Sequence, residues 1–504
     1  MRDPIASVSS AYTEFLTTAL QTRLTPPSSA AQEAALCARF QEVVRTVPAY
    51  RAFLAEHALA SASIKTLEDF RKLPPLTKEN YLLRHSLPAL CRNGRVEDCD
   101  MIAVSSGSTG KPCFWPRFLT DELQIATRFE QIFHDSFRAD ERRTLAVICF
   151  TLGTWVGGMY TAACCRHLAA KGYPLTVITP GANREEIFRV VQELGPLYDQ
   201  TILLGYPPFL KDVIDTGRAR GIDWPAYRIK WVMAGEVFSE EWRSLVGERV
   251  GATAPCWDSA SLYGTADAGV LGNETPLSIC IRRWLAVHPE EARALFGESR
   301  LPTLVQYDPK SRYFEMQEGR LLFTGDNGIP LIRYDILDRG GIVSYQEMLD
   351  FLKARGFDPR MELERQAETL PLRGDRPLPF VYVFGRSNFT VSYFGANIYP
   401  ENVTVGLEQP RIQEWVTGKF VLQVQEDSDR NSFLSVVVEL MPGLEADASK
   451  CEEIAESILA HLQRLNSEFA HYVPPEYRRP QVTLAPTGDP AHFPPGVKHR
   501  YTRK

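Results

Sequence analysis

Residues 174–204 read PLTVITPGANREEIFRVVQELGPLYDQTILL and contain one complete strand–helix–strand unit. The two ends of this stretch, 174–179 and 201–204, have the length and composition of buried strands. Between them, Asn183 is a candidate N-cap, and Glu186 stands three residues later. The apolar residues of the helix fall on one face: Ile187, Val190, Val191 and Leu194. The stretch therefore predicts a β-α-β unit.

Two more apolar runs flank this unit, LAVICF at 145–150 and IKWVM at 229–233. Short apolar strands that alternate with helices favour an α/β fold, in which helices cover a largely parallel sheet. Ligands of such proteins bind beyond the carboxyl ends of the strands. We therefore expect a ligand site where these strands end.

The two ends of the chain differ from this middle part. Residues 1 to about 100 are rich in Ala and Leu, with breaks at Pro, which predicts helices without catalytic residues. Near the other end, 365–379 is polar and contains three prolines, as an exposed connection would. We place the boundary between two domains after it, so that the large domain spans 1–384 and the small one 385–504.

The small domain is predicted to be α+β. Two β-rich runs, KFVLQVQ from 419 and FLSVVVEL from 433, come before a helical pattern. The apolar face of that helix contains Ile454, Ile458, Leu462 and Leu465.

The composition is that of an ordinary globular protein, with 44% hydrophobic and 23% charged residues among 504. This length favours two or three domains. A formal net charge of -6 gives no overall field that would attract nucleic acid or an anionic membrane surface. The N-terminal residues lack the apolar core of a signal peptide, and no apolar run could span a bilayer, so we expect a cytoplasmic protein.

Ten cysteines are scattered along the chain, without a C-x-x-C pair or the spacing of a zinc site. Reduced thiols are therefore expected. Cys256 is interpreted as a packing residue, because small buried cysteines commonly have that role.

The most distinctive short motif is Ser105-Ser106-Gly107-Ser108-Thr109-Gly110-Lys111-Pro112. Its glycines allow backbone N–H groups to converge on an anion, and its hydroxyls add donors for phosphate oxygens. It is not a Walker loop, because the spacing differs and Pro112 stands where Ser or Thr is required. Taken alone, the segment fits a solvated turn nearly as well as a phosphate loop.

Further motifs follow in the order Tyr263-Gly264-Thr265-Ala266-Asp267, Thr324-Gly325-Asp326, Arg333-Tyr334-Asp335-Ile336-Leu337-Asp338 and Gly385-Arg386-Ser387-Asn388. Together with 105–112 they resemble the core motifs of the adenylate-forming superfamily, the acyl-CoA synthetases and their relatives. The resemblance is closest to the phenylacetate-CoA ligase-like branch, whose phosphate loop is similar to SSGTTGKP, and it covers nearly the whole chain. It implies a large adenylation domain of several subdomains and a small, mobile α+β domain.

The resemblance also implies how ATP is held. The loop from Ser105 to Lys111 would bind the β- and γ-phosphates, and Asp338 would accept hydrogen bonds from the ribose hydroxyls. The segment Ala234-Gly235-Glu236-Val237 is similar to the family's adenine-binding turn, although an ordinary strand-to-helix loop is the alternative. The other nucleotide-binding residues implied are Tyr263, Gly264, Thr265 and Arg386.

Two neighbours in these motifs have open roles. Asp338 could instead form a surface ion pair with Arg339, which the match of the surrounding residues makes the weaker interpretation. Arg333 either packs structurally or approaches phosphate.

The family's Y-G-x-[ST]-E motif supplies a hydroxyl for the α-phosphate and a glutamate for magnesium, but here Ala266 and Asp267 stand at those positions. A shorter carboxylate still suits a hard cation, so Asp267 is the candidate catalytic residue and magnesium ligand. Thr265 could supply the hydroxyl from the next position, unless its side chain points elsewhere.

The C-terminal motifs imply domain rotation. The hinge residue, usually aspartate in the family, is Asn388 here, which tolerates backbone rotation well. The segment 395–401, GANIYPE, resembles the loop that faces the active site during thioester formation. Lys498 is the candidate for the adenylation lysine, but Val497 separates it from Gly496, and a solvated basic tail is an equal alternative.

The acyl pocket would be lined by 152–158 and 206–209, whose aromatic residues and glycines suit an aryl or other apolar acid as well as plain core. The sequence thus predicts an AMP-forming ligase that uses ATP, Mg²⁺, a carboxylic acid and coenzyme A. Transfer of the acyl group to an amine or a carrier protein is one alternative, and a nucleotide-binding protein without catalysis is another. A second copy of the chain is a candidate partner.

Overall fold

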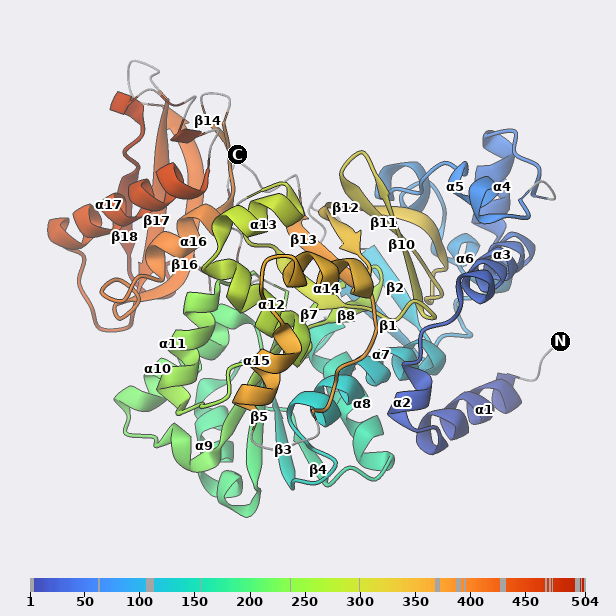
Figure 1. Ribbon diagram of the computed structural model, residues 1–504, viewed down its shortest axis with the longest axis horizontal. Coiled ribbons are helices and arrows are strands. Elements are labelled where there is room, and N and C mark those ends of the chain that lie inside the picture. The colour runs from blue at the N-terminus through green and yellow to red at the C-terminus, as the bar shows by residue number, and fades with distance from the viewer. Residues whose placement is uncertain are drawn as a thin grey trace.

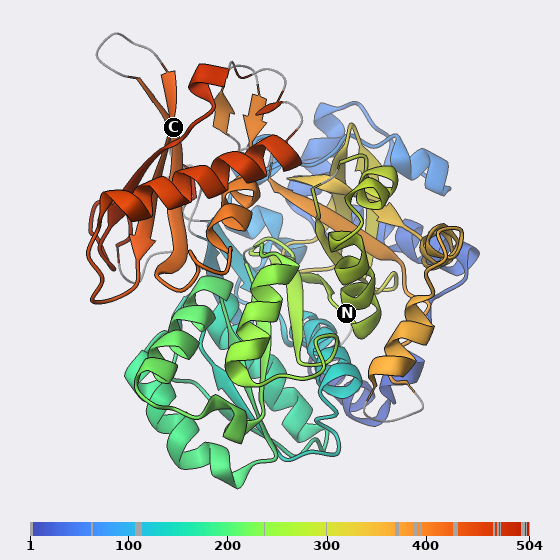
Figure 2. The same cartoon turned by 60° about the vertical axis from the view of Figure 1, so that its left-hand side comes forward.

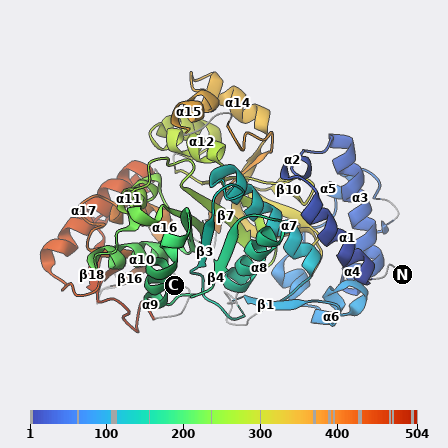
Figure 3. The same ribbon diagram turned by 90° about the horizontal axis from the view of Figure 1, so that it is seen from below.

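A computed structural model shows a large part with one long sheet and a smaller C-terminal part (Figure 1). The structure describes residues 4–61, 64–105, 113–154, 156–235, 237–298, 300–367, 372–386, 391–393, 396–426, 432–466, 469–470, 473, 475–494, 499 and 501–502. Seen from below, the helices near the N-terminus and the C-terminal helix α17 lie at opposite ends of the molecule (Figure 3). No helix within the described residues is long and apolar enough to cross a membrane.

Within the described residues, the long sheet has eleven strands in the order β10-β11-β12-β13-β9-β8-β7-β6-β5-β3-β4. Their bounds are β3 Thr144–Ile148, β4 Leu175–Ile178, β5 Gln200–Gly205, β6 Ile229–Ala234, β7 Ser259–Thr265, β8 Gly269–Asn273, β9 Thr303–Gln306, β10 Arg312–Gln317, β11 Arg320–Gly325, β12 Leu331–Val343 and β13 Phe380–Arg386. The neighbours from β4 to β7 pair in parallel. The remaining neighbours are antiparallel. The predicted parallel sheet is confirmed for the middle of the chain.

Helices cover both faces of the parallel strands, as the sequence predicts. They are α7 Leu119–Gln131, α8 Val156–Ala170, α9 Arg184–Leu194, α10 Pro207–Ala219 and α11 Glu240–Val250. Successive side chains of a strand point to opposite faces, so Leu145 of β3 packs with α9, α10 and α11, whereas Ala146 packs with α7 and α8. The predicted N-cap is present, because Asn183 accepts a hydrogen bond of 3.3 Å from the Glu186 N–H.

The N-terminal region is helical, as predicted, and ends in a hairpin. It contains α1 Pro4–Thr17, α2 Leu20–Arg23, α3 Ser29–Thr46, α4 Pro48–Glu56, α5 Leu67–Arg71, α6 Leu87–Leu90 and the paired strands β1 Met101–Ser105 and β2 Cys113–Arg117. Leu76 joins this region to the long sheet: its N–H donates to the Arg333 carbonyl at 3.1 Å, and its carbonyl accepts from Asp335 at 2.8 Å. The N-terminal region is therefore hydrogen bonded to β12 through the connection that contains Leu76.

The segment between β8 and the C-terminal part adds α12 Pro276–Ala286, α13 Pro289–Phe296, α14 Tyr345–Lys353 and α15 Pro359–Gln366. The connection at 372–379 then leads into β13, which pairs with β9 and β12. Gly385 and Arg386 still belong to this ladder, opposite Arg339 and Asp338. The chain thus leaves the long sheet just after the predicted domain boundary, which stays a prediction.

The C-terminal part has its own core. It contains β14 Val391–Tyr393, β15 Ala396–Ile398, α16 Pro400–Leu407, β16 Val416–Glu426, β17 Ser432–Leu440, α17 Ala448–Leu465 and β18 Gln481–Ala485. The last three strands form a sheet in the order β16-β17-β18. Ile454, Ile458 and Leu462 of α17 are buried against it. The predicted strands, the predicted helix and the α+β class of this region are confirmed.

Candidate active site

The predicted motifs converge where the parallel strands end. Strands β5, β6 and β7 are followed at their carboxyl ends by Tyr206, Gly235 and the segment 266–268. Gly235 has a φ of +84°, and a Cβ there would lie 2.9 Å from the Tyr206 ring, so glycine is required by both backbone and space. Val237 is partly buried, whereas Glu236 lies outside the described residues.

At the carboxyl ends of these strands, two motifs that are distant in sequence, 263–267 and 334–338, are joined by hydrogen bonds. The Tyr263 hydroxyl on β7 donates to Oδ2 of Asp338 on β12 at 2.6 Å. The Tyr334 hydroxyl on β12 donates to Oδ2 of Asp267, directly after β7, also at 2.6 Å. Both carboxylates are buried, Asp267 being 9% and Asp338 4% exposed. The structure thus brings the predicted metal ligand and the predicted ribose ligand to the same edge.

The segment that carries Asp267 is braced on both sides. Arg117 of β2 donates to the Ala266 carbonyl, and Arg312 of β10 donates to the Ala268 carbonyl at 3.0 Å. Both arginines are 2% exposed, so their guanidinium groups are fixed inside the protein. The Thr265 hydroxyl oxygen accepts a hydrogen bond of 3.2 Å from the Ala268 N–H. That oxygen therefore faces its own loop, which argues against Thr265 replacing the missing hydroxyl of position 266.

The structure decides two interpretations that the sequence left open. Asp338 is buried against Tyr263, and Arg339 instead forms a 2.7 Å ion pair with Glu298. The surface ion pair between Asp338 and Arg339 is therefore wrong. Arg333 is 6% exposed and pairs with Glu315 at 3.1 Å, so it packs structurally.

The candidate phosphate loop joins the two strands of the β1–β2 hairpin. Ser105 pairs with Cys113 at the open end of that hairpin, and the residues from Ser106 to Pro112 lie outside the described residues. One residue earlier on β1, the Val104 N–H donates to the Thr154 carbonyl at 2.9 Å. The hairpin is thereby attached to the segment predicted to line the acyl pocket.

Other predicted residues are placed only in part. Arg386 pairs with Asp338 through the backbone ladder, and its side chain lies outside the description, as do Asn388 and Lys498. Asp326 of the T-G-D motif forms an ion pair with Arg92 of the N-terminal region. It takes no part in the hydrogen bonds between Tyr263 and Asp338 or between Tyr334 and Asp267. Cys256 is 1% exposed, and a hydrogen bond with Cys280 together with burial raises its pKa, as expected of a packing residue.

Aromatic residues and glycines meet in the predicted acyl-pocket region. The rings of Phe150 and Tyr206 lie edge to face, with centroids 4.9 Å apart. Gly157 lies so close to Tyr206 that a Cβ there would be 3.3 Å from its hydroxyl oxygen. The two predicted segments therefore come together, and Phe150, which the sequence did not single out, belongs with them.

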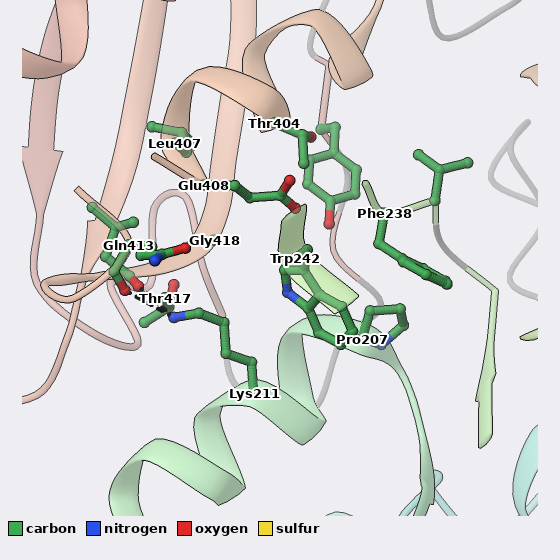
Figure 4. Close-up of a pocket in the computed structure, with 13 residues that line it drawn as sticks. Pro207, Lys211, Phe238, Trp242, Thr404, Leu407, Glu408, Gln413, Thr417 and Gly418 are labelled. Atoms are coloured by element: carbon green, nitrogen blue, oxygen red, sulfur yellow. Dashed lines mark hydrogen bonds between the residues drawn. The ribbon is translucent and has the colours of Figure 1, made fainter. Parts of the chain in front are cut away.

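The C-terminal part lies against α10 and α11 (Figure 2), and cavities remain between the two parts. One of about 410 Å³, open to solvent, contains Lys211, Trp242, Glu408 and Thr417 in its wall (Figure 4). Lys211 is 2% exposed and donates to the carbonyls of Gln413 and Val416 at 3.1 and 3.2 Å. No signal in the sequence indicates these contacts, because Lys211 is placed like any other lysine of an amphipathic helix.

The Glu408 carboxyl is buried between the two parts. The Ser239 hydroxyl, at the start of α11, donates to it. Burial raises the pKa of Glu408 to about 8. A second group of contacts lies nearer the end of β13, where Arg300 pairs with Glu401 at 3.2 Å and Arg339 donates to the Tyr399 hydroxyl.

No family model and no curated protein matches the sequence. Solved structures match the fold. A structure of 2-hydroxyisobutyryl-CoA ligase in the postadenylation state, in complex with 2-HIB-AMP, aligns with 96% of this chain and 90% of its own, with a TM-score of 0.64 and 15% identity. The same ligase in complex with 2-HIB-AMP and CoA, in the thioesterification state, aligns with 96% and 91% of the chains, with a TM-score of 0.54 and 16% identity. The chain has the adenylate-forming fold.

The TM-score is higher for the postadenylation structure of the ligase than for its thioesterification structure, at nearly equal coverage. The resemblance to the phenylacetate-CoA ligase-like branch stays a prediction.

Proposed function

We propose that this chain is an AMP-forming acid–thiol ligase, which activates a carboxylic acid with ATP and transfers the acyl group to coenzyme A. The observation that carries the proposal is the pair of buried carboxylates, Asp267 and Asp338, each held by a tyrosine of the other motif. Burial of a carboxylate costs stability even when it is hydrogen bonded. Two of them at the edge where ligands bind in parallel sheets are better explained by a ligand than by folding.

Each end of the nucleotide has candidate partners. Gly235, Glu236 and Val237 would lie beside the adenine, and Asp338 would accept from the ribose hydroxyls, with Tyr263, Gly264, Thr265 and Arg386 around them. The hairpin loop from Ser105 to Lys111 would surround the β- and γ-phosphates, for which its hydroxyls and N–H groups are suited.

The residues present also fit a magnesium ion that arrives with ATP. Asp267 Oδ1 accepts no hydrogen bond from the described residues, while Oδ2 is fixed by Tyr334. No group of three or more His, Cys, Asp or Glu within the described residues could hold a metal ion by itself. Magnesium usually takes one or two carboxylates and completes its shell with phosphates and water. Bound there, it would neutralise phosphate charge.

The proposed reaction has two steps. A carboxylate oxygen of the acid attacks the α-phosphorus, and the bond from that phosphorus to the bridging oxygen of pyrophosphate breaks. The sulfur of coenzyme A then attacks the acyl carbonyl, and the bond to the AMP oxygen breaks, which leaves a thioester. In the first step Lys498 would place its ammonium group against the charge that develops on the α-phosphate.

Between the steps, the small domain, 385–504, would rotate against the large one, 1–384, about a hinge at 385–388. Gly385, with a φ of +93°, has the backbone freedom of a hinge. The contacts between the two parts include hydrogen bonds of Lys211 and an ion pair between Arg300 and Glu401, and cavities remain beside them. Such a contact is compatible with two surfaces that separate in each catalytic cycle.

The acid is proposed to be an aryl or other apolar acid. Phe150 and Tyr206 would supply aromatic walls, and Gly157 lets the chain pass close to the Tyr206 hydroxyl. Such a lining favours a flat or apolar acyl group.

The direct test measures pyrophosphate release with Mg-ATP over a panel of aryl and fatty acids, with and without coenzyme A. Release that coenzyme A accelerates, with AMP and an acyl thioester as products, is expected. Acid-dependent release that requires an amine or a carrier protein instead would assign another acceptor. No release over the panel, together with measurable ATP binding, would reject the ligase.

Lys498 has its own test. Lys498→Ala is expected to lower the rate of adenylation on the order of a hundredfold, as loss of a donor to the transition state does. Lys450→Ala is the matched control, because Lys450 pairs with Asp447 on the surface of the C-terminal part. Unchanged adenylation by Lys498→Ala would reject the assignment.

A second candidate function is nucleotide binding without turnover. It is favoured by the loop at 265–268, where Ala266 has no hydroxyl and the Thr265 oxygen bonds to the Ala268 N–H. Turnover with any acid would exclude it.

A further inference from the structure

The two crossed motifs share one spacing. Tyr263 and Asp267 stand four residues apart, and so do Tyr334 and Asp338. In the structure each tyrosine donates to the aspartate of the other motif, at 2.6 Å in both cases. The two hydrogen bonds therefore form a reciprocal pair, in which each motif gives one phenol and receives one.

These hydrogen bonds connect strands that are not neighbours. Between β7 and β12 the sheet contains β8, β9 and β13. Tyr263 and Tyr334 are 8% and 2% exposed, so water competes little for their hydroxyls. A short hydrogen bond to a carboxylate in such surroundings is stronger than one between neutral groups. Each aspartate is thus held in one rotamer by a partner from across the sheet.

The backbone near Asp267 has little freedom to compensate for a lost contact. The carbonyls on both sides of it accept from the buried side chains of Arg117 and Arg312. With the backbone fixed, the direction of the carboxylate depends on its side-chain torsions, and Tyr334 sets these through Oδ2. Oδ1 is then presented in a defined direction.

Resting on the proposed function, we propose that the two tyrosines are positioning residues, one for each end of the nucleotide. Tyr334 fixes the carboxylate of Asp267 for a divalent cation. Tyr263 fixes the carboxylate of Asp338 for the ribose hydroxyls. Asp267 is one methylene shorter than the glutamate of the family motif, so its carboxylate extends less far from the backbone. The hydrogen bond from Tyr334 fixes the position of that carboxylate within this shorter reach.

The test is a crossed pair of variants, each with its own readout. Tyr334→Phe is expected to weaken Mn²⁺ binding about tenfold or more, measured by electron paramagnetic resonance with a non-hydrolysable ATP analogue, as loss of a residue that orients a metal ligand does. Its preference for ATP over 2′-deoxy-ATP is expected to stay unchanged. Tyr263→Phe is expected to lower that preference about tenfold and to leave Mn²⁺ binding unchanged.

Tyr81→Phe is the matched control. Tyr81 is fully buried, and its hydroxyl has no partner among the described residues. Loss of that hydroxyl is expected to change neither constant. A loss of both properties in both variants would show a general structural effect and would overturn the proposal, as would unchanged constants in both.

Asp267→Glu keeps the test decisive if Tyr334→Phe does not fold. Glutamate moves the carboxylate by one methylene relative to Tyr334, so Mn²⁺ binding is expected to weaken although the charge is kept. Binding as tight as that of the natural protein would overturn the role of Tyr334. Because Mn²⁺ and nucleotide binding are read directly, an inactive natural protein would reject the ligase and leave this test intact.

Discussion

Two regions of the molecule are built in different ways. One is the site where Tyr263 and Tyr334 donate to Asp338 and Asp267, here called the crossed-motif site. The other is the contact between the large part and the C-terminal part. At the site, buried side chains from β2, β7, β10 and β12 hold one loop and two carboxylates at fixed positions. At the contact, Lys211 reaches two backbone carbonyls, and Glu408 meets one serine beside a cavity. The first arrangement suits a site that stays fixed during chemistry. The second suits surfaces that separate.

Removal of the charge at the site is the change expected to have the largest effect. Asp267→Asn keeps the shape and can still accept from Tyr334, but it offers a cation no net charge. Adenylation is expected to fall on the order of a hundredfold at low Mg²⁺. Asp326→Asn is the control, since Asp326 forms a partly exposed ion pair with Arg92, worth at most about 1 kcal/mol. Equal losses in the two variants would contradict the assignment of Asp267.

Rigidity around the site can be tested through Gly328. A Cβ there would lie 1.8 Å from the Pro116 carbonyl oxygen of β2, the strand that carries Arg117. Gly328→Ala is therefore expected to lower the free energy of unfolding by about 1–3 kcal/mol, measured by denaturant titration. Gly247→Ala, in the middle of α11 with ordinary contacts of 3.7 Å, is expected to be neutral or to stabilise by up to about 1 kcal/mol. Equal free energies of unfolding in the two variants would show that β2 can move away from the added methyl group, and would contradict a rigid surrounding of the site.

The sequence predicts the helices and strands around the site, and the acidic residues within it, because the signals for them are local. The helix from Arg184 to Leu194 could be predicted from its cap and its apolar period, and the strands beside it from their apolar runs. The acidic residues of the site could be named from their motifs. All of these features lie within a few residues of one another in the chain.

The partners of those residues could not be predicted in the same way. Tyr263 and Asp338 are 75 residues apart, and their strands are separated by three others in the sheet. The repeated Tyr-x-x-x-Asp spacing was visible, but nothing in it says that the hydrogen bonds cross. Arg333 has a φ of +48° and points into the protein toward Glu315, which no pattern of side chains indicates.

The contact between the parts can be weakened through Lys211. Lys211→Met keeps the length of the side chain but removes its hydrogen bonds to the carbonyls of Gln413 and Val416. Adenylation is expected to slow about tenfold, because hydrogen bonds to a charged group are worth about 1.5–3 kcal/mol and about 1.4 kcal/mol corresponds to a factor of ten. Thioester formation from supplied acyl-adenylate is expected to be retained. Lys450→Met, at the surface of α17, is the control. A parallel loss of both half-reactions would speak against a role in domain arrangement.

Glu408 should make the same contact sensitive to pH. Its pKa is raised to about 8 by burial, while Lys211 on α10 and Arg282 on α12 lower it and Glu241 on α11 raises it. In the unfolded chain the pKa of a glutamate is about 4.3. Between these values the folded protein binds more protons, so its stability falls as pH rises. Glu408→Gln can still accept from Ser239 and should flatten this slope in denaturant titrations from pH 5 to 8. Glu445→Gln, which changes an exposed residue, should keep it. An unchanged slope in Glu408→Gln would mean that Glu408 is already charged in the folded protein. The contact would then be stabilised by attraction between this carboxylate and the nearby Lys211 and Arg282.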